Sequence, residues 1–459
     1  MINMKRFTSS ILLAVACLTV SAQYTTQADG TTYTLSSLSQ MAESGVSRQV
    51  DAGKTIYTIT QDVTISASDA FQIEGGVEVR MADGVRFTIE GVADLDAAER
   101  VLVTRASETD APYGFWIADD TQTATLRNFD FEYAGVHCWT TTGMNVLDCT
   151  FRYHNCVSSS SAVLHLGTTG SRYVVKGCTF EYNRYAAIAG AANFINPLLI
   201  EDNVFRCNTT SNDKKPQLNL TAADSVIVRN NVIIGSPDNT QVGGIAVANL
   251  MAGTGYYTLI EGNTVEDNSY GLTCMAPMEA IIRNNTFKNN IHCTDSLNFG
   301  MGISLYDPYS KLDAMLTGNH IEGGTYGITV VYCHEVNLGK TEVAETADDY
   351  NPGLNVFKNN GWGGTHYDLY NNSPYTIYAQ GNTWNVAEQT QEAIEEVIFH
   401  KNDADGYGEV IYWPAASTTA ISPVQNSTSD DAWYNFNGTR ISKPTQRGIY
   451  IHNGKKVVF

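Results

Sequence analysis

A short pattern of apolar and polar positions recurs ten times between Leu126 and Trp384. Each copy has an apolar residue, two free positions, a pivot residue, one free position, and then Phe, Ile, Val or Trp. The pivots lie 20 to 36 residues apart and are Phe129, Cys149, Cys178, Asn203, Asn231, Asn263, Asn285, Asn319, Asn355 and Asn382. An irregular period of this length, built from short strands and polar turns, predicts a β-solenoid.

Each copy has too few apolar side chains to bury a face alone, so it needs a neighbouring copy on either side. Parallel stacking places the pivots in one ladder, where an inward Asn satisfies backbone groups that a turn leaves unpaired. Five residues after the pivot lies a partial second row: Asn183, Asn208, Asn268, Asn290 and Asn360. The alternative, a β-sandwich with chance turns, would not restore the same residue types at the same offset.

This pattern resembles the right-handed parallel β-helix repeat family, whose architecture is shared by pectate-lyase-like and polygalacturonase-like proteins. The resemblance implies an all-β fold: a single right-handed parallel β-helix of about ten to twelve coils with N- and C-terminal caps. It implies little about function, because this architecture carries lyases, hydrolases, epimerases, adhesins and inert stalks.

Composition shifts divide the chain into six predicted segments. Residues 1–22 have the basic start, short apolar core and small-residue cleavage site of a secretory signal, and a lipoprotein site at Cys17 is the less favoured alternative. The lead-in and cap follow at 23–75, the β-helix at 76–385, a cap of helix and closing strand at 386–414, and a polar linker at 415–432.

The last segment, 433–459, has two short strand-like runs with Asn-Gly turns. It resembles a short form of the C-terminal sorting domain of the type IX secretion system. An incidental β-hairpin is the alternative. The resemblance implies export to the extracellular space or the outer-membrane surface of a Gram-negative bacterium, with the secretion and sorting machinery as a partner.

Eight cysteines remain after the signal. Cys149 and Cys178 occupy adjacent pivots, where either a disulfide or a ladder of thiols fits. No cysteine spacing predicts zinc, and we expect no metal. The net charge of −20 argues against nucleic acid or anionic membrane as a partner, and no apolar run is long enough to span a membrane.

Outward charges next to the pivots alternate in sign from coil to coil, which predicts structural ion-pair ladders. A second outward row is small and neutral in the middle. We expect it to contain His137, His165, Ala189, Asn219, Ala246, Thr273, Ser304, Thr329 and Asp368. This row lacks the carboxylate cluster of a lyase or hydrolase. The remaining catalytic candidates are His137 and His165, expected to be neighbours, and Asp307 and His334 on loops.

Candidate sugar-stacking residues are Trp139, Tyr306 and Trp362. Tyr133, Tyr153 and Tyr182 share one offset after the pivot, and strand alternation predicts that they form an inward core row. The sequence therefore favours a non-catalytic, monomeric binding or scaffold protein for an extracellular glycan or another surface partner. The alternatives are a polysaccharide lyase or glycoside hydrolase, with Ca²⁺ as a cofactor only in the lyase case, and a structural stalk.

Overall fold

The computed structural model describes residues 23–157, 162–167, 170, 172–190, 197–221, 225–249, 256–293 and 300–416, together with short stretches of the tail between 433 and 458. It forms two compact units, residues 1–416 and 417–459. The predicted signal segment 1–22 and most of the predicted linker lie outside the described residues.

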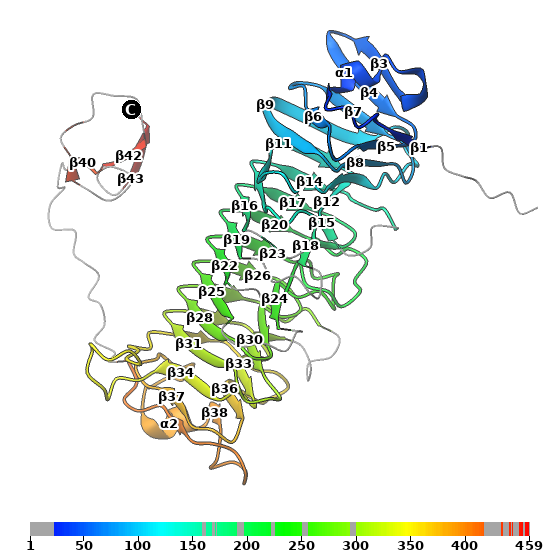
Figure 1. Cartoon of the computed structure of the whole chain (residues 1–459). Helices are drawn as coiled ribbons and strands as arrows, with labels where there is room; N and C mark the ends of the chain where they lie inside the picture. The colour runs from blue at the N-terminus through cyan, green and yellow to red at the C-terminus, as the bar shows by residue number, and fades with distance from the viewer. Residues whose placement is uncertain are drawn as a thin grey trace, which may run out of the picture. The chain divides into compact units, whose positions relative to one another are not determined.

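The first unit is a right-handed parallel β-helix, which confirms the predicted fold class (Figure 1). One wall, called sheet A here, has fourteen strands in the order β1-β5-β8-β10-β12-β15-β18-β21-β24-β27-β30-β33-β36-β38. The first two of these strands lie within 23–75, so stacking begins before residue 76, where the helix was predicted to start.

Each coil contributes one short strand to sheet A, and the bounds of these strands follow in chain order. They are β1 (Gln23–Thr25), β5 (Asp62–Ile65), β8 (Arg86–Ile89), β10 (Gly114–Ile117), β12 (Gly135–Cys138), β15 (Ala162–Leu166), β18 (Ala186–Gly190), β21 (Leu218–Thr221), β24 (Ile245–Ala248), β27 (Leu272–Met275), β30 (Met301–Tyr306), β33 (Tyr326–Val331), β36 (Tyr367–Asn372) and β38 (Ile398–Phe399).

The repeated sequence pattern forms the other two walls. The residues before the pivot form one parallel ladder and those after it form the next, as in β13 (Met144–Leu147) and β14 (Thr150–Arg152). The later coils continue with β16 (Tyr173–Lys176), β17 (Thr179–Glu181), β19 (Leu198–Glu201), β20 (Val204–Arg206), β22 (Ser225–Arg229), β23 (Val232–Ile234), β25 (Tyr257–Glu261), β26 (Thr264–Glu266), β28 (Glu279–Arg283), β29 (Thr286–Lys288), β31 (Asp313–Thr317), β32 (His320–Glu322), β34 (Glu335–Gly339), β35 (Val356–Lys358), β37 (Ile377–Ala379) and β39 (Val410–Ile411). Near the N-terminal end, β9 (Val92–Arg105) and β11 (Ala124–Glu132) run through both ladders.

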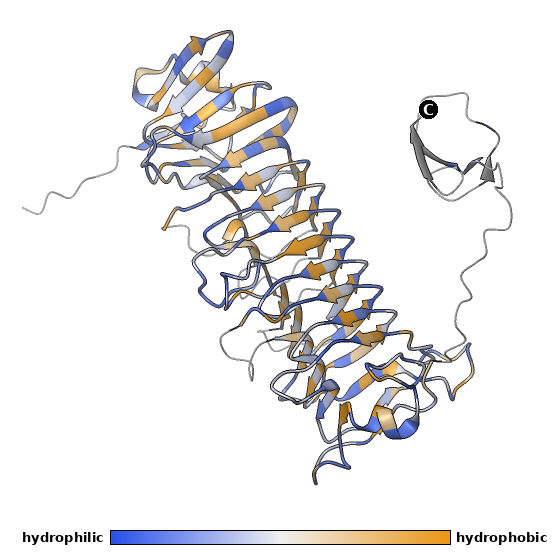
Figure 2. Cartoon of the chain, turned by 180° about the vertical axis from the view of Figure 1, so that it is seen from behind, coloured by the Kyte–Doolittle hydropathy of each residue, from blue (hydrophilic) through white to orange (hydrophobic). Residues whose placement is uncertain are grey.

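The core is a stack of like side chains between the three walls. Phe131, Phe151, Phe180 and Phe205 are fully buried, and successive rings lie 4.8 to 5.1 Å apart and within 12° of parallel. Hydrophobic strand positions alternate with hydrophilic corners along the whole stack (Figure 2). Stacking thus buries apolar faces that no single coil buries alone.

The corners of each coil use left-handed backbone conformations. The residue before every pivot from Asn128 to Gly381 has a positive φ, between 54° and 68°. Nine of these ten residues are Asn, Asp or Gly, which tolerate this conformation, and the exception is Leu354. Turn chemistry therefore repeats together with the core pattern.

The ends of the first unit carry the helices. At the N-terminal end α1 (Leu35–Leu38) starts from a Thr34 capping box and is followed by a 3₁₀ turn (Ala42–Ser44) that ends at Gly45 with φ +69°. The hairpin of β3 (Val46–Asp51) and β4 (Lys54–Ile59) follows, and β2 (Thr32–Tyr33), β6 (Ala70–Gln72) and β7 (Glu78–Met81) complete the first coils. At the C-terminal end α2 (Gln391–Glu395) supplies a helix within the predicted cap, 386–414.

The second unit is a small antiparallel sheet in the order β41-β40-β42-β43. Its strands are β40 (Trp433–Tyr434), β41 (Arg440–Ile441), β42 (Ile449–His452) and β43 (Lys455–Val458). It is thus a four-stranded sheet rather than the two strands expected. Among the described residues, no helix is long and apolar enough to cross a membrane.

Candidate functional site

The outer face of sheet A carries the side-chain row predicted from the sequence. Parallel register connects Thr88, Trp116, His137, His165, Ala189, Asn219, Ala246, Thr273, Ser304, Thr329 and Tyr370 in that order. The expected last member, Asp368, is instead buried inside the coil, where it accepts hydrogen bonds from Asn360 and the Asn385 amide. Burial raises the Asp368 pKa to about 6.

Four rings at the N-terminal end of this face form an aromatic–imidazole stack, consisting of Trp116, His137, Trp139 and His165. The Trp116 ring lies 5.5 Å from His137 and 5.3 Å from Trp139, parallel to both within 5°. His165 lies 5.3 Å from His137 and 6.0 Å from Trp139. The two histidines are therefore neighbours beside Trp139, as the sequence predicted.

A cation and a further ring extend this stack toward the N-terminus. Tyr113 lies 4.6 Å from His137, and the Arg86 guanidinium lies 4.4 Å from the Tyr113 ring and 5.0 Å from that of Trp116. Sequence reasoning missed Trp116, Tyr113 and Arg86. Since all three precede the first clear repeat copies, only their strand register connects them to His137.

Both imidazoles of the stack are neutral near pH 7. Burial, together with His165, His154 and Arg86 nearby, lowers the His137 pKa to about 2, and burial lowers the His165 pKa to about 4. Such groups donate and accept hydrogen bonds, but they are poorly matched to general acid–base work near neutral pH.

Trp139 and Tyr306 lie in the next outward row of sheet A. Trp139 follows β12 beside Gly167, and the row continues through Thr221, Ala248 and Met275 to Tyr306. A Cβ at Gly167 would lie 2.3 Å from the indole, so the absent side chain lets the Trp139 ring lie against the backbone. Both aromatic side chains are 37% exposed. Six coil steps of roughly 4.8 Å separate them by about 29 Å.

The other predicted residues lie apart from this face. Trp362 is 58% exposed in a glycine-rich turn bridged to Thr365. Asp307 is buried, and its carboxylate accepts hydrogen bonds from the amides of Tyr309 and Lys311. His334 contacts Asp313 at 3.1 Å instead. Asp307 and His334 therefore do not form a catalytic pair.

One group in the described part of the chain has donor atoms close enough for a metal ion. Asp313, His334 and Glu335 place their ligand atoms within 4.8 Å of one another on neighbouring coils. His334 and Asp313 are about half exposed and pair with each other. This arrangement is a hydrogen-bonded pair on the surface as it stands, and we assign no metal to it.

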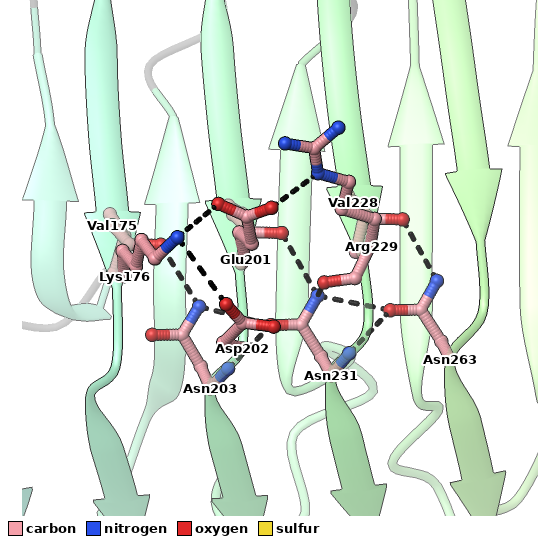
Figure 3. A network of polar contacts seen from close by, with 10 residues as sticks. Val175, Lys176, Glu201, Asp202, Asn203, Val228, Arg229, Asn231 and Asn263 are labelled. Carbon is pink, nitrogen blue, oxygen red and sulfur yellow. Dashed lines mark hydrogen bonds and ion pairs between the residues drawn. The ribbon is translucent and has the colours of Figure 1, made fainter. Parts of the chain in front are cut away.

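The pivots form a ladder of hydrogen bonds through the coils. Asn203 donates to Asn231, and Asn231 to Asn263, each at 3.0 Å (Figure 3). The bonds continue through Asn285, Asn319 and Asn355 to Asn382. Cys149 and Cys178 begin this ladder as thiols rather than as a disulfide, and the Cys149 amide donates to Cys178 Sγ at 3.5 Å.

Outward charges beside the ladder pair across coils. Lys176 and Arg229 contact Glu201 at 2.8 and 2.5 Å (Figure 3). Arg283 contacts Glu261 at 2.7 Å. These cations are engaged in structural pairs and are not available as a lyase base.

The expected tyrosine core row is wrong. Tyr153 and Tyr182 are 43% and 48% exposed, and their rings stack 6.2 Å apart at the corner that leads toward sheet A. Tyr133, Tyr153 and Tyr182 have φ of 64°, 60° and 53°. A left-handed residue interrupts strand alternation, so it turns the side chain outward.

Beside these tyrosines lies a corner groove of about 410 Å³, lined by Tyr153, His154, Asn155, Tyr182, Arg184, Thr210 and Ser211. The lining comes from three successive coils, so the sequence pattern alone did not bring it together. A second hollow of about 590 Å³ lies near the C-terminal cap, beside His366 and Glu396.

Comparison with known proteins supports the fold. Residues 134–307, fewer than half of the chain, match the family described as right handed beta helix region. A search of curated proteins gives no match. The crystal structure of the periplasmic alginate epimerase AlgG is 12% identical, with 83% of each chain covered and a TM-score of 0.47. A double mutant of AlgG is 11% identical, covers 83% of this chain and 82% of its own, and also has a TM-score of 0.47. Likeness at this TM-score carries no argument about chemistry.

Proposed function

We propose that the protein is a non-catalytic binding protein that holds an extracellular glycan along the outer face of sheet A. The observation that carries this proposal is the row from Trp139 to Tyr306, which has an exposed aromatic residue at each end. Between them lie the buried Thr221, the half-buried Ala248 and the exposed Met275, none of which is charged. Sugar rings have apolar C–H faces and polar edges, which suit aromatic rings beside a neutral surface with small polar groups.

The same face supports binding over catalysis. Glycoside hydrolysis generally uses two carboxyl groups roughly 5 to 9.5 Å apart. Among its described residues, the row from Thr88 to Tyr370 contributes no carboxylate. His137 and His165 titrate well below neutral pH. A lyase or hydrolase remains the alternative, with any site away from this row.

We further propose that the protein is exported and displayed at the cell surface as a monomer. The signal-like segment 1–22 and the sorting-domain-like segment 433–459 support this proposal. Residues 417–459 form a compact unit of their own, which fits a role in sorting. Fractionation of cells that express the chain with and without residues 433–459 tests it: retention of the shortened protein in the periplasm supports a sorting role, and unchanged surface exposure opposes it.

Affinity electrophoresis of the mature chain on a panel of neutral and acidic polysaccharides tests binding. We expect retention on one glycan, and a loss of about tenfold in affinity for Trp139→Ala or Tyr306→Ala, comparable to roughly 1.4 kcal/mol. Trp362→Ala is the matched control, an exposed aromatic residue away from the row, and it should change affinity less than twofold. Release of sugar products would show an enzyme, and no retention on any polysaccharide would favour a stalk.

A further inference from the structure

At the corner groove, the residue type differs from that of the later coils at a position where the backbone conformation is strained. The fourth residue after the pivot has positive φ in coil after coil. In the later coils it is Asp267, Asn289, Gly323 or Asn359, types that accept this conformation. Three consecutive earlier coils have a tyrosine at this position. Burial in the core does not offset the backbone strain, since Tyr153 and Tyr182 are 43% and 48% exposed. Such strain in an exposed position indicates a requirement other than folding.

The repeat is interrupted a second time one residue further on, five residues after the pivot. This position holds the second asparagine row, in which Asn183 donates to Asn208 at 2.7 Å and Asn268 to Asn290 at 3.1 Å. His154 takes the same position in the coil before Asn183, and its amide donates to Asn183 Oδ1 at 3.0 Å. Its imidazole is fully buried and does not continue the ladder.

These departures leave polar atoms unpaired in the groove. Both ring nitrogens of His154 and the Oδ1 of Asn155 are buried without a hydrogen-bond partner within the described structure. Buried polar atoms are nearly always paired, so three orphaned atoms on adjacent residues that line one hollow point to a ligand. Arg184, which is exposed, has no ion pair with any carboxylate that the structure describes, and Thr210 and Ser211 add hydroxyl groups.

The chemistry of these atoms restricts the ligand. A neutral imidazole has one donor and one acceptor nitrogen, and Asn155 Oδ1 only accepts. An anionic group without hydroxyls, such as sulfate, would satisfy Arg184 but leave two acceptors unpaired. Neighbouring hydroxyls both donate and accept, and the C–H face of a sugar ring suits a tyrosine ring.

We propose that the corner groove is a subsite for a neutral sugar ring, whose hydroxyls pair with His154, Asn155 and Arg184 beside Tyr153 and Tyr182. This proposal rests on the proposed glycan-binding function and assigns it a second contact, distinct from the row between Trp139 and Tyr306. The groove borders the aromatic–imidazole stack, because the His154 ring lies next to Gly135 at the start of β12.

The histidines allow a direct test on the full mature chain. With ¹³Cε1-labelled histidine, the chain gives at most nine signals, and the His154 signal is identified by its loss in His154→Asn. Titration with galactose or glucose should shift the His154 signal, and glucuronate, tested separately as an acidic probe, should give no larger shift. In Tyr182→Asn the neutral sugar should shift His154 at least tenfold more weakly.

The variants separate binding from folding. His154→Asn and Tyr182→Asn install the residue types that other coils use, so we expect an unchanged or higher Tm. Cys207→Asn is the matched control, because it introduces the same residue at the same corner one coil further on, outside the groove lining. It should leave the sugar response of His154 intact.

The outcomes distinguish the subsite from the overall function. A shift confined to His137 and His165, with glycan retention intact, would overturn the subsite and keep sheet A as the binding face. A response to glucuronate alone would overturn the choice of a neutral sugar. No histidine shift, together with no retention on any polysaccharide, would overturn both proposals.

Discussion

The corner after the pivot differs between two regions of one β-helix. From Asp267 to Asn359 it is occupied by Asp, Asn or Gly in a left-handed conformation, and the pivots of these coils form an unbroken asparagine ladder. From Tyr133 to Tyr182 the same backbone carries tyrosines, of which Tyr153 and Tyr182 are exposed and Tyr133 is half-buried, and His154 occupies the place of an asparagine. The first region shows what the fold requires at this corner. The second shows where other requirements override the fold.

The largest effect is expected where the ladder is regular. In Asn263→Ala, the amide and side chain of Asn231 lose their acceptor, and Val228 and Asn285 lose a donor. Because each buried unpaired group costs about 1–3 kcal/mol, the free energy of unfolding should fall by about 3–5 kcal/mol. Chemical denaturation measures this loss.

The control for this change is Asn145→Ala, on a partly buried outward position with one 3.3 Å hydrogen bond to Thr125. It should cost no more than about 0.5 kcal/mol. Equal losses in the two variants would contradict the view that the inward ladder dominates stability. By contrast, His154→Asn should cost nothing.

A smaller effect on stability is expected from exchanging the residue types of the two corners, at Tyr182 and Asn289. Tyr182→Asn should raise the free energy of unfolding by about 1 kcal/mol, and Asn289→Tyr should lower it by about 1–2 kcal/mol, because a bulky residue is disfavoured at positive φ. Both positions are exposed, so burial contributes little. Denaturation of the two variants and the double exchange checks this. If Tyr182→Asn were destabilising, the tyrosine would have a structural role after all.

The sequence predicted the fold because stacking forces the same residue types to recur at the same offset. The alternation rule correctly placed His137 and His165 on the outer face, because they lie within a regular strand. It failed for Tyr153 because a left-handed residue interrupts alternation, and for Asp368 because the row continues through Tyr370 instead.

The corner groove was harder to predict, since its lining comes from three coils and requires their register. A signal was nevertheless present in the sequence. Tyr153 and Tyr182 occupy an offset that holds Asp, Asn or Gly in the later coils up to Asn359, and His154 occupies the offset of the second asparagine row. In a repeat protein, such departures locate function better than the repeat itself does.

The smallest effect concerns the outward charge ladder, which is shared by the coils of both regions. Glu201 is nearly buried between Lys176 and Arg229, and the hydrogen bond from Lys176 is the main cause that lowers its pKa below the ordinary value of 4.5. Glu201→Gln should lower the free energy of unfolding by about 0.5–1 kcal/mol at pH 7. Glu388→Gln, on an exposed glutamate, should have no measurable effect.

The pH dependence of unfolding tests the sign of the contribution that Glu201 makes to stability. Because the folded pKa of Glu201 is lower than the unfolded one, its stabilisation is fully present above the unfolded pKa and is lost as pH falls through the folded pKa. The difference between Glu201→Gln and the unmodified chain should therefore stay constant from pH 8 to pH 6 and shrink in acid. A difference that grew on acidification would show that the folded pKa of Glu201 is raised, so that the protonated carboxyl rather than the ion pair stabilises the fold.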